Sequence, residues 1–173
     1  MRELVERAER VAAHLARRGE TIAVCESSSG GLIAAALLAV PGASAYFVGG
    51  MVIYTRQAYD ALRDFDVAEL RGARSATEEN ALVRADLARS RFGATWGLGE
   101  TGAAGPGGNR YGDPAGHTCI GIAGAVRVAA TLRTGQAGRL ANMFAFTAAA
   151  LERLCAVLES PEGKTGVRPR GGV

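Results

Sequence analysis

The chain has 173 residues, of which 48% are hydrophobic and 24 are glycines, a composition typical of a globular domain with its own core. The formal net charge is only +3. Nearly all the basic residues are arginines, and they are scattered without forming a basic stripe on any one element. We therefore expect no nucleic-acid partner.

Cysteine usage and apolar patterning indicate the cellular compartment. Cys25, Cys119 and Cys155 are odd in number and lie in separate apolar runs, which predicts buried thiols in a reducing environment rather than disulfides or a metal site. The segment Met1–Arg7 is charged and lacks the apolar core of a signal peptide, and no apolar run reaches the roughly 18 residues of a membrane span. We expect a cytoplasmic protein with no membrane partner, no metal and no cofactor.

The first third of the chain predicts a helix, a strand and a second helix. Apolar side chains recur at helical spacing over residues 3 to 17, and Gly19 follows as a helix terminator. Thr21–Cys25 is an apolar strand, and a hydroxyl-rich turn leads from it into a helix over residues 29 to 39. The Pro-Gly pair at 41 and 42 stops that helix.

The middle third alternates in the same way. Residues 46 to 55 are rich in aromatic and β-branched side chains, as in a strand, and Gly49 and Gly50 indicate a bulge or a close backbone approach. The other expected elements are a short helix over 57 to 65, irregular structure over 66 to 74, a helix from a Ser75–Glu78 capping box to Gly93, and a strand over 95 to 98.

The last third predicts a hairpin followed by a long helix. Residues 117 to 123 and 126 to 132 are strand-like runs, and Gly124, first in the two-residue link between them, suits a type II′ turn. Apolar residues recur at helical spacing from Phe144 to Leu158, and Pro161 ends that helix.

This order of elements predicts an α/β domain in layers, with a central mixed sheet flanked by helices. The sheet should be parallel at its centre and carry an antiparallel edge. We expect one domain over residues 1–159 and a disordered tail over 160–173, which is polar and glycine-rich.

Two hydroxyl- and glycine-rich turns are the candidate functional segments. Residues 26 to 31 (ESSSGG) follow a strand and open a helix, so free backbone N–H groups there suit an anion or a nucleophile. At least one of these serines has an alternative role as a helix cap. Residues 100 to 109 (ETGAAGPGGN) also follow a strand, so both turns should lie on the same rim of the sheet, where small residues admit a phosphate or ribose. A flexible surface loop is the alternative for this second segment.

Four motifs in order resemble the CinA C-terminal-domain family, named for competence- and damage-inducible proteins. They are CESSSGG at 25 to 31, VPGASAYFVGG at 40 to 50, a strand leading to Tyr54, and TGAAGPGG at 101 to 108. The family signatures run approximately ESCTGG, VPGSSxxFxGGxxxYSNxAK and TGIAGPxGG. The resemblance covers residues 3 to about 158. Family proteins often carry a preceding domain similar to molybdopterin-binding proteins, and this chain resembles the stand-alone form.

The resemblance implies an amidohydrolase that deamidates nicotinamide mononucleotide (NMN) and so takes part in NAD recycling. A serine would attack the carboxamide carbon, ammonia would leave, and water would release the acid. The nucleophile falls on Ser27 and an active-site tyrosine on Tyr54. The implied ligand-binding residues are Ser29, Gly30, Gly31, Thr101, Gly102, Ala103, Ala104 and Gly105. The resemblance also implies a homodimer or a larger homo-oligomer.

The sequence departs from the family at its general base. The family lysine falls on Tyr59, and the single lysine, Lys164, lies in the tail. A phenol is a weak base unless a cation lies close, and arginine stays protonated. His117 is a possible substitute base, with a hydrogen-bonded strand-edge histidine as the alternative, and Glu100 or Glu26 could orient water. The second function class is therefore a catalytically weakened protein that still binds a pyridine nucleotide or a similar phosphorylated amide.

Overall fold

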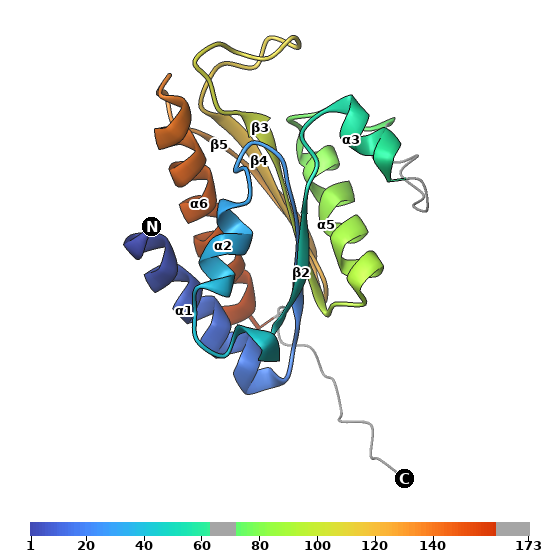
Figure 1. Cartoon of the computed structure of the whole chain (residues 1–173), viewed down its shortest axis with the longest axis vertical. Coiled ribbons are helices and arrows are strands. Elements are labelled where there is room, and N and C mark those ends of the chain that lie inside the picture. The colour runs from blue at the N-terminus through green and yellow to red at the C-terminus, as the bar shows by residue number, and fades with distance from the viewer. Residues whose placement is uncertain (63–71, 162–173) are drawn as a thin grey trace.

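The computed structural model describes residues 1–62 and 72–161 (Figure 1). In chain order the elements are α1 (Arg2–Arg18), β1 (Ile22–Glu26), α2 (Leu32–Leu38), the 3-10 helix η1 (Ala43–Ala45), β2 (Phe47–Val52), α3 (Arg56–Ala61), α5 (Glu78–Phe92), β3 (Trp96–Ala103), β4 (His117–Ala123), β5 (Arg127–Arg133) and α6 (Arg139–Glu159).

The five strands form one mixed sheet in the order β2-β1-β3-β4-β5. β1 pairs in parallel with both β2 and β3, and β3, β4 and β5 form antiparallel pairs. The predicted fold class is confirmed: the sheet has a parallel part around β1 and an antiparallel edge at β5. Because β1 and β3 run in the same direction, the turns that follow them leave the sheet at the same edge.

Helices cover the two faces of the sheet unequally (Figure 1). α1, α2 and α6 pack against one another on one face, and α5 lies on the other, in contact with β1, β3 and β4 and with the short α3 beside it. The larger core is shared by α1, α6 and the strands, and it includes the buried side chains of Leu15, Trp96 and Leu151. A smaller apolar cluster under α5 includes Ile53 and Ala88. The helices therefore leave the carboxyl ends of β1 and β3 free to carry a site.

Within the described residues, α6 is the one helix long and apolar enough to cross a membrane. Its apolar face is buried, however, against α1, α2 and the sheet, and Phe146, Ala150 and Leu154 have no exposed surface. That packing is the pattern of a core helix.

Glycines in the strands let α5 lie directly on the sheet backbone. A Cβ atom built at Gly97 would lie 1.9 Å from the Ala85 carbonyl oxygen, and one at Gly99 would lie 2.0 Å from the Ala81 carbonyl oxygen. Gly121 on β4 is also close to α5, since a Cβ there would lie 2.5 Å from the Ala81 oxygen. The close approach brings side chains of α5 to the sheet edge where β1 ends.

The predicted irregularity in the second strand is confirmed. The register between β1 and β2 shifts after Ile22, which pairs with Phe47, while Ala23 pairs with Gly49, so Val48 is the extra residue of a bulge. A Cβ at Gly49 would meet the Phe92 ring at 2.7 Å, and one at Gly50 would meet Val24 at 2.7 Å. Both glycines therefore serve close packing.

β3 is longer than the sequence predicts. Residues 100 to 103 were expected in a loop, but they continue the strand and pair with β4 as far as Ala103 with His117. The reason is Gly102, where a Cβ would lie 2.4 Å from the His117 carbonyl oxygen, so the small residues admit the neighbouring strand. The longer strand makes Glu100 a fully buried strand residue.

Three local expectations were wrong. Thr77, rather than Ser75, caps α5, because its hydroxyl accepts a hydrogen bond from the Asn80 N–H. The second helix begins at Leu32 rather than at residue 29, after two glycines with positive φ. The hairpin link has three residues, and Gly124 has no positive φ as a type II′ turn requires. A Cβ at Gly124 would instead lie 2.3 Å from the Trp96 ring.

Parts of three expectations lie outside the described residues. They are residues 63 to 65 of the helix expected over 57 to 65, most of the irregular stretch over 66 to 74, and most of the disordered tail expected over 160–173, which carries Lys164. The helix itself, α3, ends at Ala61, earlier than expected, because Leu62 no longer has helical backbone angles. The domain limits of 1–159 and the disordered tail stay predictions.

We predict that Gly99→Ala lowers the free energy of unfolding by about 3 kcal/mol or more, because the new methyl group meets α5 backbone that cannot move alone. Gly107→Ala is the matched control, since no atom lies within 4 Å of a Cβ there. Urea unfolding of both variants measures the effect, and the control should change by less than about 1 kcal/mol. Equal stabilities of the two variants would contradict the proposed packing constraint.

Candidate functional site

A cavity of about 640 Å³ opens where β1 and β3 end. Ser27, directly after β1, lines it together with Thr101 and Gly102 near the end of β3. The predicted meeting of the serine turn and the second glycine-rich segment is therefore confirmed. Tyr54 and Tyr59 line the same cavity.

The Glu100 carboxylate holds the serine turn in place. It is fully buried, and its Oε2 accepts hydrogen bonds from the backbone N–H of Ser27 at 3.1 Å and of Ser29 at 2.9 Å. The Ser29 hydroxyl, which shares its one proton between this oxygen and Glu26, also contacts Oε2, while the hydroxyls of Ser28 and Thr118 donate to Oε1. One carboxylate of β3 thus takes five donors, and four of them come from the turn.

Glu26 occupies the N-terminus of α2. Its carboxylate accepts hydrogen bonds from the N–H groups of Gly31, Ile33 and Ala34 at 2.9, 3.1 and 2.8 Å, and from the Ser29 hydroxyl at 2.7 Å. Burial raises the pKa of Glu26 above its ordinary value, and these donors offset part of that rise. The expectation that the α2 N-terminus attracts a bound anion was wrong, because Glu26 already occupies it.

The three serines therefore have different roles. The hydroxyls of Ser28 and Ser29 are bound to buried carboxylates, whereas the Ser27 hydroxyl has no hydrogen-bond partner among the described residues and faces the cavity. The sequence left open which serines have a structural role and which is the candidate nucleophile. The hydrogen bonds give Ser28 and Ser29 the structural role and leave Ser27 as the candidate. The geometry leaves the Ser27 hydroxyl beside the cavity, and no described residue hydrogen-bonds it as a base.

Arg84 is a cavity residue that sequence reasoning missed. It lies on α5 and is fully buried, and its guanidinium donates to the phenol oxygen of Tyr59 at 2.5 Å. Other donors of the same group bind the Asn80 amide oxygen at 2.8 Å and the carbonyl oxygens of Glu26 and Ile53 at 3.3 and 3.1 Å. The sequence signal was an arginine in the apolar face of a helix, which has to be paired when buried.

The cavity wall is strongly basic. Arg56, Arg74 and Arg110 line it in addition to Arg84, and none of its described lining residues is an aspartate or a glutamate. Arg74 is paired with Asp113 at 2.8 Å, just outside the lining, and this contact lowers the pKa of Asp113. The wall therefore suits an anionic ligand.

An exposed aromatic ring stands at the rim of this basic wall. The guanidiniums of Arg74 and Arg110 lie over the ring of Tyr111, 5.1 and 4.9 Å from its centroid. Tyr111 is 41% exposed, so part of the ring is free for other contacts. The cavity thus combines cationic groups with a stacking surface.

The other predicted site residues lie at different depths. Tyr54 is 55% exposed, and its hydroxyl accepts a hydrogen bond from Arg139 of α6 at 2.9 Å. Among the predicted ligand-binding residues, Thr101 and Gly102 line the cavity, and Ser29 contributes its hydrogen bonds to the two glutamates instead. Five others do not appear in the cavity lining, namely Gly30, Gly31, Ala103, Ala104 and Gly105.

His117 lies on β4 and is not a lining residue of the cavity. Its ring Nε2 is 3.0 Å from the Ala76 carbonyl oxygen, and its buried Nδ1 has no partner among the described residues. The described structure therefore gives His117 no contact with Ser27, and the proposed substitution for the missing base stays a prediction.

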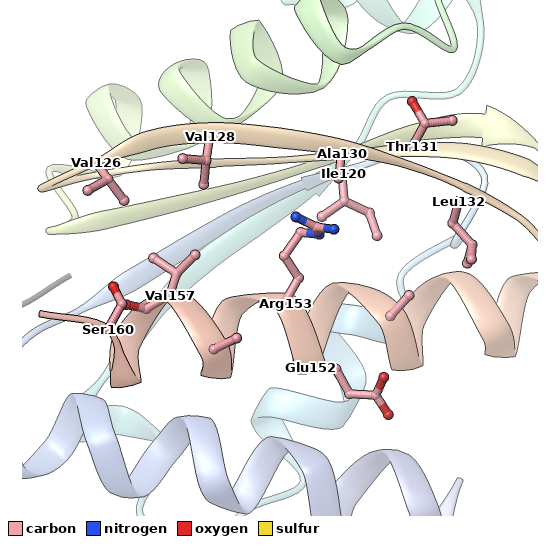
Figure 2. Close-up of a pocket in the computed structure, with 12 residues that line it drawn as sticks. Ile120, Val126, Val128, Ala130, Thr131, Leu132, Glu152, Arg153, Val157 and Ser160 are labelled. Carbon is pink, nitrogen blue, oxygen red and sulfur yellow. The ribbon is translucent and has the colours of Figure 1, made fainter. Parts of the chain in front are cut away.

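A second cavity, of about 620 Å³, lies between β5 and α6 (Figure 2). Most of its lining is aliphatic, including Ile120, Val128, Leu132 and Val157, with Arg153 of α6 reaching across it. It contains neither of the glycine-rich segments nor an unpaired nucleophile at a strand end. The first cavity is therefore the candidate functional site.

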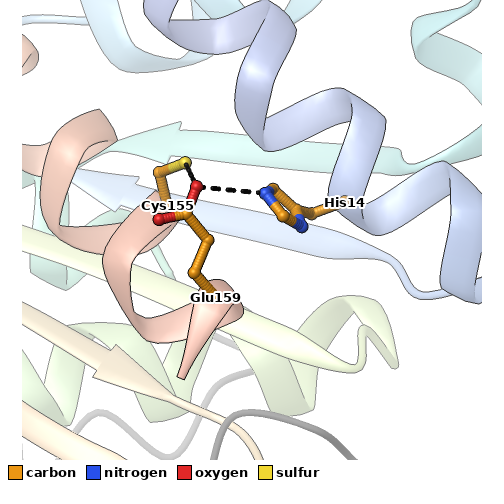
Figure 3. A group of neighbouring side chains, drawn as sticks. All are labelled: His14, Cys155 and Glu159. Carbon is orange, nitrogen blue, oxygen red and sulfur yellow. Dashed lines mark hydrogen bonds and ion pairs between the residues drawn. The ribbon is translucent and has the colours of Figure 1, made fainter. Parts of the chain in front are cut away.

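One group of potential metal ligands joins α1 to α6 (Figure 3). The Glu159 carboxylate lies 3.3 Å from both His14 Nε2 and Cys155 Sγ. Arg10 also binds this carboxylate at 3.2 Å, and Arg17 contacts His14 Nδ1 at 2.8 Å. Two guanidiniums already compete for the ligand atoms, so the group acts as a polar link between the helices.

We predict that Glu100→Gln lowers the free energy of unfolding by about 2 kcal/mol or more, because an amide nitrogen replaces an oxygen that only accepts hydrogen bonds. Glu9→Gln, at an exposed position of α1, is the matched control, with an expected change within about 0.5 kcal/mol. Urea unfolding compares the two variants. A Glu100→Gln protein as stable as the control would show that this carboxylate does not hold the turn.

Comparison with known proteins agrees with the fold. A family model described as the CinA C-terminal domain matches residues 5–158. A CinA-like protein of Chlorobaculum tepidum is 40% identical over 155 residues, which cover 86% of this chain and 36% of that protein. Another, from Synechococcus sp. strain CC9902, is 40% identical over 110 residues, covering 64% of this chain and 26% of that protein. The chain thus spans about a third or less of these curated relatives.

Solved structures show the same fold. The competence/damage inducible protein CihA from Agrobacterium tumefaciens is 30% identical with a TM-score of 0.80, covering 91% of this chain and 96% of that one. A CinA superfamily protein from Klebsiella pneumoniae has a TM-score of 0.81 at 24% identity, covering 90% and 97% of the two chains. With a family model that matches nearly all of the described fold, the chain belongs to the CinA C-terminal domain family.

Proposed function

We propose that this protein is an amidohydrolase that deamidates nicotinamide mononucleotide. Ser27 is the nucleophile: its oxygen attacks the carboxamide carbon, and ammonia leaves with the serine proton. Water then attacks the acyl-serine ester and releases the carboxylate. The observation that carries this proposal is the single unbound hydroxyl of the serine turn, which faces a basic cavity. The family relationship supports the reaction class.

The basic wall accounts for the phosphate of such a substrate. Arginine guanidiniums form paired hydrogen bonds with phosphate oxygens, which a neutral wall could not provide. Arg56 and Arg110 are exposed cavity residues, so they can bind a phosphate at the rim while the carboxamide reaches Ser27. The Tyr111 ring, which contacts the guanidiniums of Arg74 and Arg110, borders the cavity at the same rim.

The second candidate function is a weakened enzyme that binds the same nucleotide. Tyr59 stands at the family lysine position, and its oxygen accepts a hydrogen bond from Arg84, which stays protonated. No described residue hydrogen-bonds the Ser27 hydroxyl to accept its proton. General-base assistance is typically worth about 10²–10⁴-fold. We therefore expect NMN deamidation slower by about that factor than in relatives that carry the lysine.

We predict slow ammonia release from nicotinamide mononucleotide that depends on Ser27. Ser27→Ala should abolish it, because no other hydroxyl of the turn is free. Coupled detection of ammonia over hours at high protein concentration measures the rate. Ser90→Ala, on the far side of α5, is the control and should keep the full rate. NMN binding without any release would favour the weakened-enzyme alternative, and neither binding nor release would reject both.

We predict that Arg110→Gln weakens binding of nicotinamide mononucleotide by about tenfold but leaves nicotinamide riboside unaffected, because the riboside has no phosphate for the guanidinium to contact. Titration calorimetry with the two ligands measures this difference. Arg89→Gln, an exposed arginine of α5 that does not line the cavity, is the matched control. An equal loss for both ligands would place Arg110 away from the phosphate.

A further inference from the structure

Arg84 connects the nucleophile's turn to Tyr59 through a single guanidinium. One nitrogen, Nη1, donates to the carbonyl oxygen of Glu26, the residue before Ser27, at 3.3 Å. The other terminal nitrogen, Nη2, donates to the Tyr59 phenol oxygen at 2.5 Å. The phenol oxygen therefore lies at the Ser27 end of the cavity rather than at its exposed rim.

The position of this guanidinium is fixed by its other contacts. Its Nε donates to the Asn80 amide oxygen at 2.8 Å, and Nη1 also donates to the Ile53 carbonyl oxygen at 3.1 Å. The side chain is 1% exposed, and the planar group presents all its donors in one fixed fork. Tyr59, by contrast, is on the six-residue α3 and only half-buried. Arg84 therefore positions the phenol, and not the reverse.

The hydrogen bond also sets the direction of the phenol proton. Because Arg84 donates to the oxygen of Tyr59, the hydroxyl hydrogen of the phenol has to point away from the guanidinium. No described residue accepts that hydrogen, while the oxygen borders the cavity that Ser27 also lines. The phenol is thus left as a donor without an acceptor in the described part of the chain.

We propose that Tyr59, positioned by Arg84, donates a hydrogen bond to the acyl oxygen of the ligand when Ser27 attacks. In this role the tyrosine stabilises the negative charge that develops on that oxygen, instead of taking the serine proton as the family lysine would. The inference rests on the proposed function, since it needs an acyl group beside Ser27. A fixed donor aimed at such an oxygen is typically worth about 10²–10³-fold in rate.

The test compares two ligands that differ only at the reacting carbon: nicotinamide mononucleotide, and its analogue with an aldehyde in place of the carboxamide. The Ser27 oxygen can add to the aldehyde carbon, and the serine proton passes to the aldehyde oxygen, which gives a hemiacetal. Its oxygen occupies the position of the developing oxyanion. Tyr59→Phe removes only the hydroxyl and keeps the ring, so the α3 packing is preserved.

Tyr59→Phe should weaken binding of the aldehyde analogue about 10-fold or more, and that of the carboxamide less than about 3-fold. Equal losses for both ligands, or no loss for either, would overturn the inference while the proposed function stands. If the wild-type protein binds neither ligand, the proposed function itself fails. The two failures are therefore distinguishable by calorimetry on the wild-type protein.

The positioning role of Arg84 is tested with a double-mutant cycle. Arg84→Lys should weaken binding of the aldehyde analogue in the wild-type protein but have little further effect in Tyr59→Phe, because the affected hydroxyl is already absent. Arg56→Lys, which lines the same cavity without a contact to Tyr59, should act independently of that variant. Additive effects of Arg84→Lys and Tyr59→Phe would contradict the positioning role. Should Arg84→Lys fail to fold, the ligand comparison on Tyr59→Phe still decides the donor role.

Discussion

The buried carboxylate of Glu100 is the constraint on which the site depends. It stands on β3, but most of its hydrogen bonds reach the turn after β1, so it fixes two adjacent strand ends relative to each other. A buried charge without these donors would be strongly destabilising, and the turn without the carboxylate would leave two N–H groups unpaired. Each therefore requires the other. The result is that Ser28 and Ser29 are used structurally and only Ser27 keeps a free hydroxyl.

The close packing of α5 on the sheet is a second constraint, and it brings the Arg84 guanidinium to the same turn. Gly97, Gly99 and Gly121 let α5 approach the sheet backbone, and Arg84 can then reach the carbonyl oxygens at the ends of β1 and β2. The two constraints act on opposite faces of the turn. Glu100 and Glu26 bind its N–H groups, and Arg84 binds the carbonyl oxygen that precedes Ser27. The carboxylates of Glu26 and Glu100 are thereby buried at the turn, and four arginines line the cavity.

The helices and strands could be predicted from the sequence where the local spacing of apolar or β-branched residues determines the element. Helical spacing from Leu4 to Leu15 and the β-branched run around Val52 gave the right elements, and their alternation gave the right sheet. The end of β3 could not be predicted, because a run of glycine and alanine is compatible both with a loop and with a strand that packs closely on its neighbour. The role of Gly102 becomes visible only once its distance from β4 is known.

The sequence located the candidate nucleophile of the site but not the charged side chains that surround it. Ser27 and Tyr59 could be found from motif positions, since a motif fixes places along the chain. Arg84 binds Tyr59, 25 positions away, and Glu100 binds Ser27, 73 positions away, so these partners are set by the packing of α5 and the pairing of β3. In the sequence, Tyr59 at the family lysine position indicates the loss of a base. The structure adds what surrounds this tyrosine. A cation does lie beside position 59, because the guanidinium of Arg84, on α5, donates a hydrogen bond to the Tyr59 phenol oxygen. Among residues 1–62 and 72–161, none accepts a hydrogen bond from the Ser27 hydroxyl, and the phenol that Arg84 holds in place is the donor that we propose instead.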